Sequence, residues 1–254
     1  MPNSTVLLGL AGFAAGAMNA VAGGGSFVSL PALIAAGVPS VQANASSTVA
    51  LFPGGLASAW MYRDGFGPVG AASLRSLLLT TLIGGAIGAG LLLSTPSRTF
   101  DLVLPWLLLL ATFALALGPR VGAWFRRRQG EVRPWIVLLI QFALGIYGGY
   151  FGGAVGIMMV AIWGLIDRRE LQSLHGVRTL LVAAANCIAV LFFVYARAVR
   201  WPETLIMLVA AAAGGYGGAH IGRRLPPEMA RRLTLLLTGT ITLAFFARAY
   251  LHVF

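Results

Sequence analysis

The side chains in this sequence that could bind a small molecule are amides and hydroxyls, and several of them flank a run of glycines. In "NAVAGGGS", an amide precedes three glycines and a hydroxyl follows them. A helix that restarts after such a break offers unpaired backbone N–H groups and the positive end of its dipole, and both attract anions. The residues that we interpret as candidate anion ligands here are Asn19, Gly23, Gly24, Gly25 and Ser26.

Later apolar stretches supply further candidates of the same kind. From "QANASST", "GGAVG" and "LHGVRTLLVAAAN" these are Asn44, Ser47, Thr48, Gly153, Gly156, His175, Arg178 and Asn186. Amides are costly in lipid, which favours positions facing a cavity for Asn19 and Asn186. Helix packing is an equal alternative for the hydroxyl residues, and Arg178 could instead be a boundary charge that snorkels to the headgroups.

The acidic residues narrow the chemistry further. All seven fall in or beside expected loops. A cation carrier usually needs a carboxylate within the membrane, so the pattern favours an anionic substrate. Enzyme motifs such as HExxH, GxSxG and the phosphate-binding GxxxxGK[ST] are missing, and Cys187 is the single cysteine. We therefore expect no enzyme activity, no cofactor and no metal cluster.

Composition defines the class of protein that must position these groups. Of 254 residues, 58% are hydrophobic and 10% are charged, and the mean hydropathy is +0.86. The sequence therefore predicts an all-α polytopic membrane protein with no sizeable soluble domain. The net charge of +11 comes from arginines placed mostly in short loops. Such charges set topology beside anionic lipid headgroups, so the expected partners are membrane lipids and a small anion, with no nucleic acid.

Eight apolar segments follow one another along the chain. They cover residues 4–36, 41–62, 69–94, 100–118, 134–166, 173–196, 203–222 and 231–253. The segments 4–36 and 134–166 run to 33 residues, which exceeds the 20 or so that one crossing needs, and each has glycines in its interior. Each is better interpreted as two shorter helices joined at the glycines. The start of the first segment lacks a basic flank, so it is expected to belong to the fold rather than to a signal peptide.

The two long segments occupy matching places in an internal repeat. At a shift of 131 residues, Gly25 meets Gly156, Asn44 meets His175 and Thr48 meets Thr179; at 130, "GGAIG" meets "GGYGG". The segment order and lengths agree throughout. Broken segments at corresponding positions of two halves indicate the binding site of a transporter. For "GGAIG" and "GGYGG", close helix packing is the favoured interpretation.

Arginine placement predicts how the halves are oriented. The two most basic loops, "PRVGAWFRRRQGEVRP" and "GRRLPPEMARR", are separated by three apolar segments. Both loops face the cytoplasm only if segment 134–166 enters and leaves on one side. This scheme places 14 arginines inside and 4 outside, with both termini outside. The expected single transmembrane domain, 1–254, thus contains two inverted-topology repeats, 4–118 and 134–254, around a cytoplasmic basic loop, 119–133. Each repeat is a glycine-broken helical hairpin plus three transmembrane helices.

Together these stretches resemble a known family. The order "GFAAGAMNAVAGGGSFVSLPALIAAGVPSVQANASSTVA", then "GGAIGAGLLLSTPSR", "GGYFGGAVGIMMV" and "GGAHIGRRLPPEMARRL", is similar to the TauE/SafE family of sulfite exporters. The second half departs from the family pattern, with "GGAVG" where a three-glycine run is typical and no proline at the position equivalent to Pro31.

The resemblance implies a secondary transporter that exports a small sulfur-containing anion, sulfite or an organosulfonate such as sulfoacetate, across the bacterial inner membrane. Import or exchange of the same anions is the alternative, because alternating access is reversible. The sequence leaves open the direction, the coupling ion and a homodimer. A sensor or scaffold is less favoured, because no segment is left for a soluble output domain.

Overall fold

The computed structural model describes residues 2–126, 132–153, 155–167, 173–222 and 227–251. Within these ranges the chain is helical, with one isolated antiparallel bridge between Val69 and Ala72. The elements in chain order are α1 (Pro2–Ala22), α2 (Ser26–Ala35), α3 (Ser40–Met61), η1 (Arg63–Gly65), α4 (Leu74–Ser94), α5 (Ser97–Arg126), α6 (Pro134–Phe151), α7 (Val155–Ile166), α8 (His175–Tyr195), α9 (Trp201–Gly222) and α10 (Pro227–Tyr250).

Several of these helices have the length and composition of membrane spans. Five contain apolar stretches long enough to cross a bilayer: Leu74–Ser94, Ser97–Leu117, Pro134–Phe151, His175–Tyr195 and Arg231–Tyr250. Together with the shorter apolar helices α2 and α7, they make this a multi-pass helical membrane protein, as the composition predicts.

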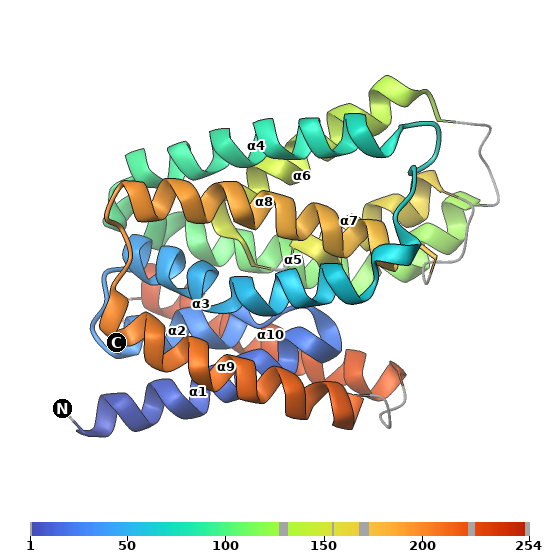
Figure 1. Cartoon of the computed structure of the whole chain (residues 1–254). Helices are drawn as coiled ribbons and strands as arrows, with labels where there is room; N and C mark the ends of the chain where they lie inside the picture. The colour runs from blue at the N-terminus through green and yellow to red at the C-terminus, as the bar shows by residue number, and fades with distance from the viewer. Residues whose placement is uncertain (1, 127–131, 154, 168–172, 223–226, 252–254) are drawn as a thin grey trace.

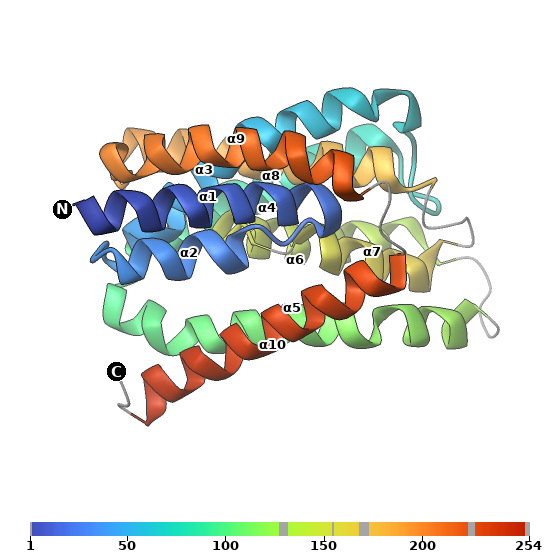
Figure 2. The ribbon, with the colours of Figure 1, turned by 90° about the horizontal axis from the view of Figure 1, so that it is seen from below.

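Both long apolar segments are broken at their glycines, as predicted. Segment 4–36 forms α1 and α2, and segment 134–166 forms α6 and α7. Figure 2 shows the chain reversing after α1, so that α2 lies beside it and runs back. Helix α7 likewise returns toward the end of the bundle from which α6 starts (Figure 1). Each pair is therefore a helical hairpin with its turn inside the bundle.

The predicted loop 119–133 is shorter than expected. Helix α5 continues through Pro119 to Arg126, so the first part of this region is helical, and residues 127–131 lie outside the described ranges. The apolar pattern ends near Leu117, where the candidate span ends. A helix can continue past a membrane boundary because its backbone hydrogen bonds are internal, so the sequence pattern marked the end of the span rather than the end of the helix.

The ends of the bundle carry different numbers of arginines. Figure 1 shows both chain termini and the α4–α5 and α8–α9 connections at one end. Among the described residues, that end carries four arginines: Arg98 at the start of α5, Arg197 and Arg200 after α8, and Arg248 in the last turn of α10. The ends of α3, α5 and α9 and the starts of α4, α6 and α10 lie at the opposite end. That second end carries the arginines Arg63, Arg75, Arg126, Arg133, Arg231 and Arg232.

Glycines set the closest helix contacts, which join α1 to α9 and α4 to α6. A Cβ atom added at Gly16 would overlap the Ala211 carbonyl, and one at Gly214 would overlap the Phe13 carbonyl. In the second pair, a Cβ at Gly88 would overlap the Ile146 carbonyl. Small residues let helix backbones approach closely in membranes. The packing interpretation of "GGAIG" and "GGYGG" is therefore confirmed.

Helix α3 runs through the centre of the bundle, and its two halves differ in burial. Residues 43–50 are buried without interruption, and this stretch includes one amide and three hydroxyl side chains. Beyond it, Leu51, Gly55 and Ser58 are only partly buried. The first half of α3 thus lies inside the protein, whereas the second half borders open space.

Candidate functional site

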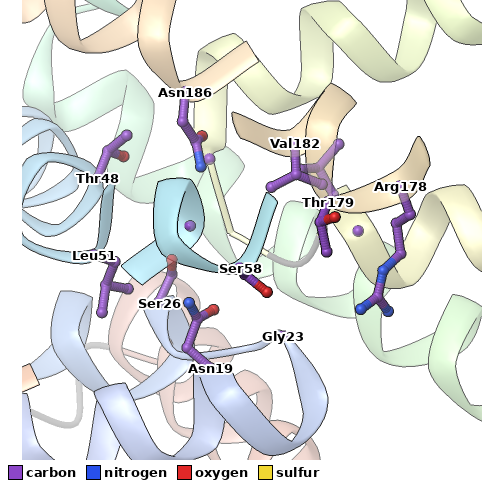
Figure 3. Close-up of a pocket in the computed structure, with 14 residues that line it drawn as sticks. Asn19, Gly23, Ser26, Thr48, Leu51, Ser58, Arg178, Thr179, Val182 and Asn186 are labelled. Carbon is purple, nitrogen blue, oxygen red and sulfur yellow. The ribbon is translucent and has the colours of Figure 1, made fainter. Parts of the chain in front are cut away.

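A polar cavity lies where the two hairpin turns meet α3 and α8. Its volume is about 70 Å³, and part of it is open to solvent. Figure 3 shows Asn186 and Asn19 approaching it from opposite sides, with Arg178 to one side. The lining residues are Asn19, Gly23, Ser26, Thr48, Leu51, Gly55, Ser58, Gly152, Val155, Gly156, Arg178, Thr179, Val182 and Asn186.

Helices α3 and α8 line the cavity with equivalent positions. Their lining sets include Thr48, Leu51 and Gly55 on α3, and Thr179, Val182 and Asn186 on α8. Spacings of three, four and seven residues place each set on one face of its helix. Each member of the first set is 131 residues before its counterpart in the second. The shift found in the sequence therefore relates side chains that share one cavity.

The two helix breaks require glycine where the chain turns. Gly23 has φ +78° and Gly152 has φ +69°, a region that strains other residues. Space is limited at the second break, because a Cβ on Gly152 would lie 2.7 Å from Thr48 Oγ1. The turns also meet each other, since a Cβ on Gly153 would lie 2.9 Å from the Ser26 Cβ. The starts of α2 and α7 are thereby brought together at the cavity.

Arg178 is the only charged residue among the described residues that line the cavity. Its Nη2 donates a hydrogen bond to His175 Nε2 at 2.9 Å. Because a guanidinium carries donors alone, the imidazole nitrogen must be the acceptor, and His175 is neutral with its proton on Nδ1. The Tyr62 ring meets the His175 ring edge-on, with 4.6 Å between centroids. His175 thus accepts one of the guanidinium's hydrogen bonds at the edge of the cavity.

A cluster of hydroxyls closes the bundle on the other side of the cavity. Ser29 Oγ and Ser47 Oγ are 2.6 Å apart and join α2 to α3. Ser46 Oγ accepts a 3.0 Å bond from the Arg200 backbone N–H in the α8–α9 connection. We call Ser29, Ser46 and Ser47 the serine cluster. It links α2, α3 and the α8–α9 connection through hydrogen bonds, and its three side chains are buried.

Asn44 adds one more tie beside the serine cluster. Its Nδ2 donates to the Tyr150 carbonyl at 3.0 Å, near the end of α6. A carbonyl in the last turn of a helix lacks its usual partner, and the amide supplies one. Asn44 therefore anchors the α6–α7 hairpin to α3.

Comparison with known proteins places the chain in a family. The sequence profile described as "Sulfite exporter TauE/SafE" matches residues 8–245. The chain belongs to the TauE/SafE family. This TauE/SafE protein is 28% identical over 233 residues to "Probable membrane transporter protein YfcA" of Escherichia coli strain K12, a match that covers 91% of this chain and 84% of the relative.

Two further relatives carry similar descriptions. A "Probable membrane transporter protein" of Haemophilus influenzae is 25% identical over 238 residues, with 94% of this chain and 90% of the relative covered. "Probable membrane transporter protein ORF9" of Sinorhizobium sp is 27% identical over 241 residues, with 94% and 89% covered. No solved structure matches the chain significantly. The TauE/SafE protein is thus a member of a family of membrane transporters.

The structure brings together about half of the residues chosen from the sequence. Those that line the cavity are Asn19, Gly23, Ser26, Thr48, Gly156, Arg178 and Asn186. The others lie around it: Gly24 and Gly25 are buried in the first turn, and Gly153 is buried in the second. Asn44, Ser47 and His175 make the contacts described above. These six surround the site of the TauE/SafE protein without lining it.

Sequence reasoning missed several lining residues. The lining residues that were not chosen are Leu51, Gly55, Ser58, Gly152, Val155, Thr179 and Val182. The repeat could have indicated two of them, because Leu51 and Gly55 are shifted by 131 residues from Val182 and Asn186. Ser58 follows Gly55 by about one helical turn. Among the described residues, no group of three or more His, Cys, Asp or Glu is placed to hold a metal ion.

Proposed function

We propose that this TauE/SafE protein is a secondary transporter that exports a small sulfur-containing anion, sulfite or an organosulfonate such as sulfoacetate. The observation that carries the proposal is the lining of the cavity, where Arg178 is the one charged side chain among the described amides and hydroxyls. Such a lining offers hydrogen-bond donors to an oxyanion, and a guanidinium binds sulfonate-like oxygens through charge-assisted bonds. Family membership supports the choice of a sulfur anion.

The starts of two short helices support an anionic ligand as well. Helices α2 and α7 both begin immediately after the glycine turns that border the cavity. The first N–H groups of a helix have no partner within the helix, and the helix dipole places partial positive charge there. Two such ends, supplied by two hairpins, would stabilise negative charge beside Arg178.

The route across the membrane follows from an inverted-repeat arrangement. We infer two repeats, 4–118 and 134–254, each with a glycine-broken hairpin and three further helices. The equivalent lining positions on α3 and α8 support this arrangement, because inverted repeats place the substrate at their interface. Rocking of one repeat against the other would then expose the cavity to each side in turn.

The orientation in the membrane follows from the arginines. We infer that the arginine-rich end of the bundle faces the cytoplasm of the bacterial inner membrane and that both termini face outward. Ser58 and Arg178, which line the cavity, lie on α3 and α8 near that end. The serine cluster lies toward the other end. The conformation described here would therefore be the inward-facing one, with the outer side closed.

Thermal stability of the purified protein tests the substrate class. A ligand that binds the folded state alone raises the apparent stability. We expect stabilisation by sulfite and sulfoacetate and none by acetate. Sulfate and thiosulfate test whether the size of the anion matters. Stabilisation by acetate equal to that by the sulfur anions would contradict the proposal. Flux of the stabilising anion in vesicles of known orientation then distinguishes export from import or exchange.

A further inference from the structure

An apolar groove lies between α5 and α6 and shares no lining residue with the anion cavity. Helix α5 packs against α7 and has few contacts with α6, so space remains between α5 and α6. The groove has a volume of about 480 Å³, and its surface is almost entirely hydrocarbon. It is formed by Leu107 and Leu110 on α5, six residues of α6 from Ile140 to Tyr150, and Met158 and Ile162 on α7.

The groove is accessible from outside the bundle. Met158 is buried at its base, whereas Leu110 on α5 and Ala143 on α6 are exposed at its two sides. In a multi-pass membrane protein, the outer surface of such spans meets lipid. The medium in front of the groove is therefore hydrocarbon.

The two tyrosines of the lining use their hydroxyls within the protein. Tyr147 Oη donates to the Leu107 carbonyl at 3.2 Å, and Tyr150 Oη donates to Thr95 Oγ1 at 3.3 Å. Both phenol protons are thus engaged, and the rings offer the groove their carbon atoms. An apolar cavity of roughly 150 Å³ already stays dry and binds a hydrocarbon ring. A hydrocarbon chain therefore fits this groove better than water or a polar solute does.

A basic and an aromatic side chain stand at one end of the same helix face. Ile140, Leu144 and Tyr147 are spaced by four and three residues, so they lie on one face of α6. Arg133, at the start of α6, precedes Ile140 by seven residues, or about two turns on the same side. Arg133 and Trp135 are exposed. Arginine and tryptophan are typical of the headgroup level of a membrane.

The groove has the length of one leaflet. Ile140 and Tyr150 are ten residues apart, which corresponds to roughly 15 Å along α6. The hydrocarbon core of a bilayer is about 30 Å thick, so one leaflet accounts for about half of this. Tyr150 is next to the α6–α7 turn inside the bundle, and Arg133 is at the arginine-rich end. An acyl chain that starts beside Arg133 thus has room to run to the middle of the membrane.

We propose that this groove binds one acyl chain of an anionic membrane phospholipid, with the lipid phosphate at Arg133. The chain fills the space between α5 and α6 and contacts Met158 and Ile162 on α7. Because α7 begins at a turn that borders the anion cavity, the bound lipid supports the hairpin that carries this turn. The site is separate from the proposed transport function and does not depend on the identity of the anion.

Native mass spectrometry of the purified protein measures the bound lipid. The probes are phosphatidylglycerol and phosphatidylcholine with identical acyl chains, titrated into delipidated protein in detergent. We expect one tightly bound phosphatidylglycerol per chain. Phosphatidylcholine should bind about fivefold more weakly, because one arginine near a membrane surface favours an anionic lipid by about this factor.

Two variants locate the chain and the headgroup. Ala143→Phe places a ring in the groove and should weaken both lipids by about tenfold or more, because the ring displaces several methylenes of the chain. Ala244→Phe, at an exposed alanine in the α10 span, is its matched control and should bind both as wild type does. Arg133→Gln should reduce the preference for phosphatidylglycerol to within about twofold. Arg75→Gln, exposed at the start of α4, should keep the preference.

Several results would overturn the proposal. These are equal binding of the two lipids by wild type, unchanged lipid binding in Ala143→Phe, and an unchanged preference in Arg133→Gln. A lipid-free dimer that Ala143→Phe converts to monomers would assign the groove to a second copy of the chain instead. If Ala143→Phe does not fold, the comparison of Arg133→Gln with Arg75→Gln still decides. No anion is present in these measurements, so their outcome is independent of the proposed function.

Discussion

Helices α3 and α8 border the same cavity with equivalent positions, yet they offer it different chemistry. Asn44 on α3 corresponds to His175 on α8, and Ser47 corresponds to Arg178. On α3 these side chains bind other parts of the protein, the Tyr150 carbonyl and Ser29. On α8 they form the pair that presents a guanidinium to the cavity. At these two pairs of equivalent positions, α3 thus contributes contacts within the protein, whereas α8 contributes a charged group to the cavity.

This asymmetry has a consequence for the substrate. Two identical halves would favour a symmetric or spherical ligand at their interface. Here the charged lining residue, Arg178, and the amide residue Asn186 both come from α8, and Gly55 occupies the α3 position equivalent to Asn186. We therefore expect a ligand to be held mainly along α8, which would set its direction in the cavity.

The largest effect is expected from removing the charge on α8. Arg178→Gln takes away a charge-assisted hydrogen bond to the anion, so affinity should fall by about 10- to 150-fold, or 1.5 to 3 kcal/mol. Anion titration of the purified variant measures this. Arg75→Gln, at the start of α4 and not among the lining residues, is the control and should bind as wild type does. An affinity of Arg178→Gln within twofold of wild type would remove this arginine from the site.

The equivalent change on α3 should affect stability instead. Asn44→Ala removes the donor to the partly buried Tyr150 carbonyl, so the free energy of unfolding should fall by about 0.5 to 1.5 kcal/mol. Anion affinity of the folded fraction should stay near that of wild type. Thermal unfolding with and without ligand measures both quantities. A loss of affinity without a loss of stability would mean that Asn44 is a ligand, and that α3 and α8 act alike.

The helix breaks could be predicted from the sequence because length and composition both point to them. A segment of 33 apolar residues is too long for one crossing, and the interior glycines mark where it turns. Arg178 and Asn186 could be predicted because polar groups are costly within a membrane span and their spacing places them on one helix face. Ligand binding by Arg178 and Asn186 stays a prediction.

The face of α3 that lines the cavity was harder to predict, for physical reasons. Residues 43–50 are buried on every side, so their polarity has no helical period that would indicate a direction. Leu51 and Gly55 carry no polar group and therefore give no chemical signal. The contacts of Asn44 and Ser47 depend on α6 and α2, which approach only in the folded bundle. Sequence thus identified the polar helix but not the face that borders the cavity.

A smaller effect is expected from His175, which acts through Arg178. His175→Ala removes the acceptor that holds the guanidinium, so anion affinity should fall several-fold, corresponding to about 0.5 to 1.5 kcal/mol. Adding the same change to Arg178→Gln should have little further effect, because the two residues form one unit. Anion titration of both single variants and the double variant measures the coupling. Full additivity would contradict the positioning role and make His175 an independent ligand.

The smallest effect is expected at Gly55, where α3 differs most simply from α8. No atom lies within 4 Å of a Cβ added there, so Gly55→Ala should fold normally, and its higher helix propensity should raise the free energy of unfolding by up to about 1 kcal/mol. Gly152→Ala is the matched contrast. Its φ of +69° and the nearby Thr48 hydroxyl should make the same methyl destabilising by more than about 1 kcal/mol.

Anion affinity then shows whether the surface at Gly55 touches the ligand. If the ligand lies along α8, one methyl on the α3 side should leave the anion affinity within about twofold of the wild-type value. The added group enters empty space and removes no hydrogen bond. A large loss of affinity in a stable Gly55→Ala protein would mean that the ligand contacts the α3 backbone closely. The two helices would then share the ligand, and the missing side chain at Gly55 would be as much a part of the site as the amide of Asn186.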